Sequence, residues 1–179
     1  MNKRLLTAAT ALSLVIPAAL AGGAEGQPLA PVSTAQVSND TDVLFMEVAS
    51  MSNLTEIATS QLALQKSTNQ NVRAYAQEMI TEHTRAQTEL RALAAAKGVR
   101  IADKPGADQR LQYNRLTTLT GAAFDAAYKN VQVNGHQMTL DLIGTYRPVS
   151  KDQQVNAYAA KIQPVVARHL EEAKALPGS

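Results

Sequence analysis

The sequence predicts an all-α protein, a four-helix bundle with a long connection between its second and third helices. Three observations carry this prediction. Apolar residues recur every three or four positions through four long segments, as expected for one buried helix face. Ala, Leu, Gln and Thr are abundant while Trp and Cys are absent, a composition that favours helices over sheets. A short internal repeat relates two of the segments.

The first pair of helices is expected at about residues 41–67 and 69–97. Asp40 or Asp42 offers an N-cap to the first helix, and Lys97-Gly98 is a typical end for the second. The apolar stripe of the first helix is Val43, Met46, Ala49, Leu54, Ile57 and Leu64. The second helix has the clearest stripe, with Val72, Tyr75, Ala76, Met79, Ile80, His83, Ala86, Leu90 and Leu93.

Residues 99–121 form a long connection with a turn at 103–106 and a short helix at about 107–120. The third bundle helix is expected at about 122–146, where Pro148 stops it. The fourth spans about 151–176, and Pro164 inside it is expected to kink the helix or open a local bulge. A connection of this length can carry the chain from one end of the bundle to the other.

The internal repeat is a Val-x-Ala-Tyr-Ala motif that begins at Val72 and again at Val155. In both copies the tyrosine precedes a histidine, His83 or His169, and the two spacings differ by about one helical turn. Each histidine therefore stays on the face of its tyrosine. The repeat predicts two related helical hairpins. The hydroxyls of Tyr75, Tyr128 and Tyr158 are expected to reach polar groups of the bundle.

The first residues are predicted to lie outside the folded domain. Lys3 and Arg4 precede an apolar run that ends in an A-x-A site, which predicts a signal peptide over residues 1–21, cleaved after Ala21. Residues 22–40 are rich in Gly, Pro and Ser and are interpreted as a flexible linker, with the bundle domain at 41–177. We therefore expect a periplasmic or secreted protein with no integral membrane span in its mature form.

Charge and motifs exclude several functions. Removal of residues 1–21 takes away two basic residues and leaves acidic and basic side chains balanced, so nucleic-acid binding is not expected. The sequence has no Gly-rich phosphate loop, no G-x-S-x-G motif and no cysteine nucleophile. It therefore lacks the residues that a hydrolase or a nucleotide-binding protein would need. Partners are expected to be a second copy of the chain or another envelope protein.

The strongest functional signal is the placement of the three histidines. His83, His136 and His169 fall on the apolar faces of three different predicted helices. Imidazoles aimed from several helices into one bundle core are a known way to build a metal site. The first helix has no histidine, but Glu56 lies among small residues that leave room for its carboxylate to turn inward.

The expected heights of these four residues along the bundle axis indicate which of them could share one ion. At 1.5 Å per residue, Glu56, His83 and His136 come to similar levels, whereas His169 is expected about 10 Å from His136 along the axis. The sequence thus predicts Glu56, His83 and His136 as ligands of one Fe or Zn ion, with His169 as a fourth candidate. A di-iron centre is not expected, because Ile80 and Val166 stand where its Glu-x-x-His motifs need glutamates.

Three functions remain open at this point. The first is a non-enzymatic protein that binds a single transition metal. The second is a structural or interaction bundle whose histidines are hydrogen-bonded core residues. The third is a redox enzyme with a degenerate metal centre, which would need an open coordination position. No catalytic residue is predicted, and the balance of the sequence evidence is against an enzyme.

The sequence resembles the secreted bacterial family known as domain of unknown function 4142. The resemblance covers about residues 42–176, and its most specific part is Phe124-Asp125-x-x-Tyr128 with His136 downstream. The segment from Val72 to His83 and the segment from Ala159 to His169 also match, with Glu82 where the family usually has Asp. The family implies a ferritin-like four-helix bundle outside the cytoplasm, and it implies no activity.

Overall fold

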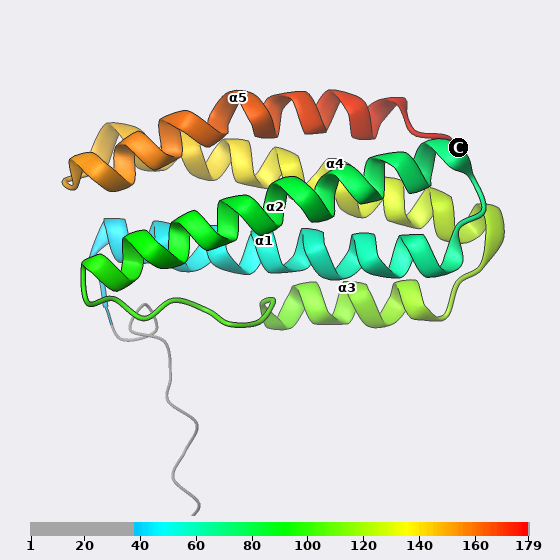
Figure 1. Cartoon of the computed structure of the whole chain (residues 1–179), viewed down its shortest axis with the longest axis horizontal. Coiled ribbons are helices and arrows are strands. Elements are labelled where there is room, and N and C mark those ends of the chain that lie inside the picture. Colours follow the sequence, from blue (N-terminus) through cyan, green and yellow to red (C-terminus); the bar gives the residue numbers. More distant parts are fainter. Residues whose placement is uncertain (1–37, 179) are drawn as a thin grey trace, which may run out of the picture. The chain divides into compact units, whose positions relative to one another are not determined.

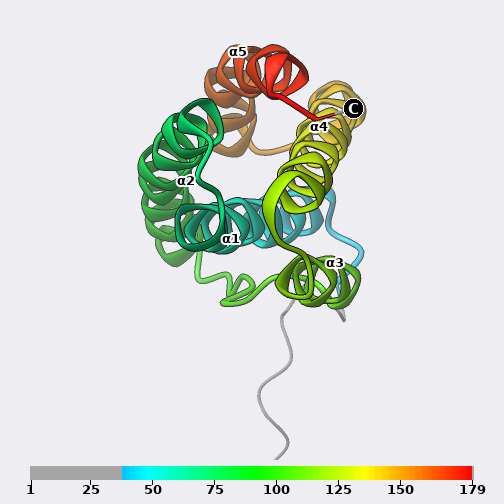
Figure 2. The ribbon, with the colours of Figure 1, turned by 90° about the vertical axis from the view of Figure 1, so that its right-hand side faces the viewer.

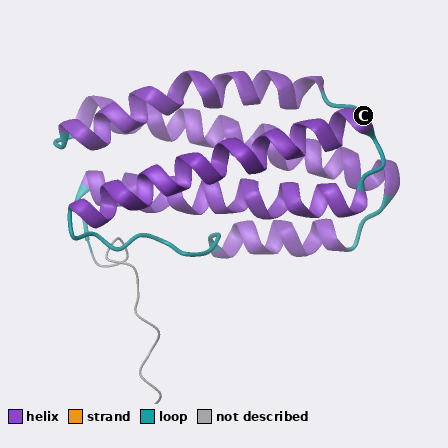
Figure 3. Ribbon diagram, in the orientation of Figure 1, coloured by secondary structure: helices purple, strands orange, loops and turns teal. Residues whose placement is uncertain are grey.

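The computed structural model describes residues 38–178, which form five α-helices and one 3-10 turn, with no strand among them (Figure 3). The predicted signal peptide, its cleavage site and most of the predicted linker lie outside the described residues. The elements are α1 (Thr41–Lys66), α2 (Gln70–Ala96), α3 (Ala107–Thr117), α4 (Gly121–Tyr146), η2 (Arg147–Val149) and α5 (Gln153–Ala175). The predicted all-α class and the helix order are confirmed.

Two antiparallel hairpins, α1–α2 and α4–α5, make the bundle (Figure 1). The end-on view shows α1 beside α4 and α2 beside α5, with α3 outside the bundle against α1 and α4 (Figure 2). The connection after α2, together with α3, returns the chain along the bundle, so α2 and α4 run in the same direction (Figure 1). The predicted role of the long connection is therefore confirmed.

The helix ends follow from local chemistry. Asp40, Asn69 and Asp152 cap α1, α2 and α5 by accepting hydrogen bonds from backbone N–H groups of the first turn. After α2, Gly98 adopts a φ of +66°, which an L side chain rarely tolerates, and the helix ends there as predicted. Helix α5 continues through Pro164 without a break. None of the described helices is long and apolar enough to cross a membrane.

The core consists of two apolar clusters. One contains Phe45, Met46, Leu90, Ile143 and Val155, and the other contains Val72, Met79, Phe124, Tyr128 and Ala173. Between these stretches of the helices lie buried polar side chains, namely Ser50, Asn53, Glu56, Thr59, Ser60, His83, Gln87, Gln132, His136 and His169. Burying a polar group is costly unless it is paired, so this polar layer is where a function is to be sought.

The repeated tyrosines connect the two hairpins. The hydroxyl of Tyr75 in α2 donates to the backbone oxygen of His169 in α5, at 3.3 Å. The hydroxyl of Tyr158 in α5 donates in return to the backbone oxygen of Ala86 in α2, also at 3.3 Å. Tyr128 shares a 2.8 Å hydrogen bond with Ser60. The predicted pairing of tyrosine hydroxyls with polar groups of the bundle is confirmed.

Candidate metal centre

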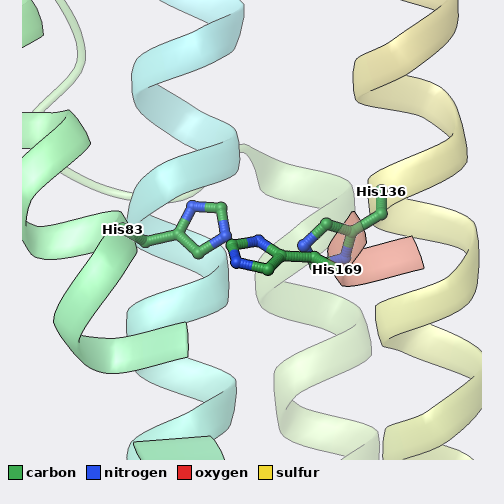
Figure 4. A group of neighbouring side chains, drawn as sticks. All are labelled: His83, His136 and His169. Atoms are coloured by element: carbon green, nitrogen blue, oxygen red, sulfur yellow. The ribbon is translucent and has the colours of Figure 1, made fainter. Parts of the chain in front are cut away.

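Three imidazoles converge in the polar layer. His83 comes from α2, His136 from α4 and His169 from α5, and their rings point toward one another (Figure 4). The ring centroids are 5.5 Å apart for His83 and His136, 5.4 Å for His83 and His169, and 5.3 Å for His136 and His169. All three residues are buried. The rings therefore form a nearly equilateral triangle inside the bundle.

The size of this triangle fits a single ion. An ion about 2.0–2.1 Å from one nitrogen of each ring would hold three ring centroids about 5.2–5.5 Å apart, in a tetrahedral to trigonal arrangement. One ring nitrogen of each histidine already lies within 4.8 Å of the corresponding nitrogens of the other two. Ligands of one ion need a nitrogen spacing of about 3.3–3.6 Å, so small rotations of the rings would complete the site.

Each imidazole has one nitrogen bound to an oxygen and one nitrogen free. Nδ1 of His83 donates to Oδ1 of Asn53 at 2.9 Å, and Nδ1 of His136 donates to the backbone oxygen of Gln132 at 2.8 Å. Nε2 of His169 lies 2.9 Å from Oε2 of Glu82. Within the described chain, the remaining nitrogens, Nε2 of His83, Nε2 of His136 and Nδ1 of His169, have no hydrogen-bond partner. When one nitrogen of a neutral imidazole carries the proton and donates it to an oxygen, the other nitrogen keeps a free lone pair. This tautomer is the one that binds a metal.

A chain of hydrogen bonds fixes the tautomer of His83. The hydroxyl of Ser50 donates to the backbone oxygen of Ala102, at 2.7 Å, and Gln87 donates its amide to Ser50 Oγ, also at 2.7 Å. Asn53 donates to the oxygen of Gln87 at 3.2 Å, which leaves Asn53 Oδ1 to accept from His83. A backbone carbonyl can only accept a hydrogen bond, so the donor and acceptor of each hydrogen bond in this series are fixed.

Replacing Asn53 by leucine is expected to weaken metal binding by about 10- to 100-fold, the usual effect of losing a group that orients a metal-binding histidine. Leucine has a similar shape but accepts no hydrogen bond from Nδ1 of His83. Titration with Zn²⁺ against a competing chelator measures the change. Asn71→Leu, on the exposed first turn of α2, is the matched control and should bind as the unmodified protein does. Equal affinities for the two variants would contradict the role of Asn53.

Glu82 holds His169 from outside the bundle. Its Oε2 lies 2.9 Å from His169 Nε2 and 2.8 Å from Nη2 of Arg168, which also pairs with Glu78 and Glu172. Glu82 was not predicted to belong to the site, because on its own helix it points away from His83. Its partner is the histidine of the neighbouring helix α5, a relation that periodicity within α2 does not show.

Burial keeps the three imidazoles neutral. It lowers the pKa of His83 well below the usual value, and the neighbouring His136 and His169 lower it further. Burial lowers the pKa of His136 to about 4, against an opposing hydrogen bond to Gln132. The pKa of His169 is lowered by burial and by Arg168, and Glu82 opposes this. Neutral imidazole is the metal-binding form, so no proton has to be displaced at neutral pH.

The estimate that placed His169 about 10 Å from His136 along the axis is wrong, since the centroids of these rings are 5.3 Å apart. Two effects close the gap. The 3-10 turn η2 extends α4 to Val149, which adds height on the side of His136. Side chains also lean toward the N-terminus of their helix, so in an antiparallel hairpin His136 leans away from the turn and His169 toward it.

Glu56 lies beside the histidine triangle. Its Oε1 is 4.0 Å from Nδ1 of His136, the nitrogen that already donates to Gln132. The carboxyl is buried, and its Oε2 has no hydrogen-bond partner among the described residues. Burial raises the pKa of Glu56 to about 8. The compact group is therefore His83, His136 and His169, and Glu56 lies next to it on the α1 side.

Gly135 provides the space that Glu56 occupies. A Cβ atom at position 135 would lie 2.7 Å from Oε1 of Glu56, which is closer than such atoms approach. Gly144, in the same helix, has nothing within 4 Å of the corresponding position. Gly135 could not be singled out from the sequence, because a glycine inside a helix carries no signal of what lies opposite it.

Gly135→Ala is therefore expected to destabilise the protein by about 1–3 kcal/mol, the usual effect of overpacking a core. Gly144→Ala is the matched control and should be neutral or stabilise by up to about 1 kcal/mol, because alanine is the better helix former. Urea unfolding of both variants measures the two changes. A Gly135→Ala variant as stable as Gly144→Ala would show that Glu56 does not need this space.

Fold and site together define a class: a helical bundle with a buried group of three histidines. The chain matches the family described as "Domain of unknown function (DUF4142)" over residues 27–176, and it belongs to that family. The resemblance seen in the sequence is thereby confirmed. A comparison with curated proteins gives no match.

Solved structures of one protein, CopM, are similar to this fold. CopM in the Cu(I)-bound form aligns with a TM-score of 0.63 at 17% sequence identity, covering 74% of this chain and 92% of that chain. CopM in the apo form aligns with a TM-score of 0.61 at 17% identity, covering 74% of this chain and 93% of that chain. At this level of identity the likeness concerns the fold, which is a helical bundle in both proteins.

Proposed function

We propose that this protein binds a single transition-metal ion through His83, His136 and His169 and has a non-enzymatic role in handling that metal. The observation that carries the proposal is the convergence of three buried imidazoles, each of which has one nitrogen with no hydrogen-bond partner in the described chain. A purely structural role for the histidines does not account for these three nitrogens. Leaving a buried polar atom unpaired costs about 1–3 kcal/mol, which a bound ion would offset.

The donor set favours zinc or copper. Imidazole nitrogens suit Zn, Cu, Fe and Ni, and sites for Fe(II) commonly add a carboxylate to two histidines. Here the third donor is a histidine, and the buried Met46 and Met79 belong to the two apolar clusters. CopM is a bundle of similar fold whose structures include Cu(I)-, Cu(II)- and Ag-bound forms, which supports testing copper beside zinc. Iron is the third ion to test.

The predicted signal peptide places this role in the periplasm or outside the cell. A protein there meets metal ions as they arrive, and a buried site in a bundle without cysteines does not depend on the redox state of thiols. The support for this location is the sequence of residues 1–21, because the structural description begins at residue 38.

Metal content tests the proposal. The purified protein is loaded with Zn²⁺ or Cu²⁺, desalted and analysed by mass spectrometry for metal per chain. One ion per chain is expected, and it should be lost in a His83→Ala, His136→Ala double variant. Glu171→Ala, an exposed change on α5, is the control for surface binding and should leave the content unchanged. No metal above background in the unmodified protein would overturn the proposal.

A further inference from the structure

A small cavity reaches the histidine site from one side. It has a volume of about 60 Å³ and lies mainly between α2 and α5, with His83 and His169 among its lining residues. A single water needs only about 10–15 Å³ of such space, so the cavity has room for a few small molecules. His136 is not among its lining residues. Thr139, one turn further along α4, does line it, so the cavity lies next to the site and contacts two of its three histidines.

The inner walls of this cavity are mostly apolar. Ala49, Ala86, Ile162 and Val166 line it, and none of these side chains can coordinate an ion. Three histidines leave a four-coordinate ion with one open position, because the usual geometry of such an ion is tetrahedral. Because His83 and His169 both line the cavity, the open position of an ion that they hold would face it.

The mouth of the cavity is charged. Glu89 and Lys161 pair across it at 2.7 Å, and Glu82 pairs with Arg168. Arg85 also lines the cavity and forms no ion pair within residues 38–178. The charged residues that line the cavity are two acidic and two basic side chains, namely Glu82, Glu89, Arg85 and Lys161, so their formal charges balance. The attraction for a small anion would therefore come from the bound cation itself, because its three imidazole ligands are neutral and leave its positive charge uncompensated.

Resting on the proposed function, we infer that the bound metal carries one exchangeable ligand from solvent, and that small anions replace it through the cavity between α2 and α5. The step is a ligand exchange: a metal–water bond breaks, a bond from the anion to the metal forms, and water leaves by the same opening. No electron is transferred. The ligand class is an anion of one to a few atoms, because the cavity has no room for a larger group.

Azide binding to the Co²⁺-loaded protein tests this inference. Co²⁺ takes the place of Zn²⁺ and gives a visible absorption spectrum that changes when a fourth ligand is exchanged. Addition of azide to the unmodified protein is expected to shift this spectrum with saturation. Ala86→Leu should fill much of the cavity while all three histidines stay in place, and we expect it to weaken azide binding at least tenfold with one Co²⁺ per chain retained. Ala92→Leu, exposed on the same helix, is the matched control.

The outcomes separate this inference from the proposed function. Stoichiometric Co²⁺ with no response to azide would mean a closed site and would overturn the inference while leaving metal binding in place. Equal azide affinity in Ala86→Leu and Ala92→Leu would show that the anion reaches the metal by another route, which also overturns it. Failure to bind Co²⁺ at all would overturn the proposed function. Should Ala86→Leu unfold, Val165→Phe fills the same cavity from α5 and takes its place.

Discussion

His169→Ala is expected to lower the affinity for Zn²⁺ by at least about 100-fold, more than the 10- to 100-fold loss typical of groups that only orient a ligand. The reason is geometric, because His169 is one corner of the histidine triangle and provides one of three nitrogens within 4.8 Å of one another. Glu56→Gln keeps the shape of the side chain and all three nitrogens, so we expect it to bind Zn²⁺ within about tenfold of the unmodified protein.

Competition with a chelator measures both affinities under the same conditions. The pair of variants distinguishes the two groupings of site residues. A large loss in Glu56→Gln and a small loss in His169→Ala would favour the trio that the sequence analysis preferred, namely Glu56, His83 and His136. The reverse result would favour the three histidines. Circular dichroism of both proteins confirms that the helices are intact.

Glu56→Gln is also expected to change how stability depends on pH. Burial raises the pKa of Glu56 to about 8 in the folded protein, above the ordinary value of 4.5, so the folded state binds more protons than the unfolded state between these values. Stability from this group is then present at low pH and is lost as pH rises through the folded pKa. Glutamine does not ionise, and the variant should not show this loss.

The size of the effect follows from 1.36 kcal/mol per pKa unit. Between pH 6 and pH 8 the free energy of unfolding of Glu56→Gln should rise by about 2 kcal/mol relative to the unmodified protein. Urea unfolding of both metal-free proteins at several pH values gives this difference. The histidines cancel in it, because their lowered pKa values make both proteins lose stability as pH falls below about 6.5. A constant difference across pH would show that Glu56 is ionised in the folded state.

The sequence predicted the helices well because each has local signals. Asp40, Asn69 and Gly98 lie at helix ends in the structure, and the apolar stripes became the two core clusters. It also predicted that histidines from three helices would face inward. These features depend on residues within one helix, where a period of 3.6 residues determines the face.

The arrangement between helices could not be predicted as well. The distance from His136 to His169 depends on η2 and on the lean of side chains in an antiparallel hairpin, and counting residues from the turn missed both. The contact of Glu82 with His169 and the space that Gly135 leaves for Glu56 join residues far apart in sequence. Nothing in the spacing along a single chain encodes such a contact.

The three histidines come from two different hairpins, and this has a consequence for folding kinetics. His83 belongs to the α1–α2 hairpin, whereas His136 and His169 belong to the α4–α5 hairpin. An unfolded chain, or either hairpin alone, therefore has no complete site to offer an ion. Metal that binds only after the hairpins dock would hold them together and slow their separation, while the rate of docking itself would stay the same. Such an ion would extend the lifetime of the folded protein and would not accelerate its formation.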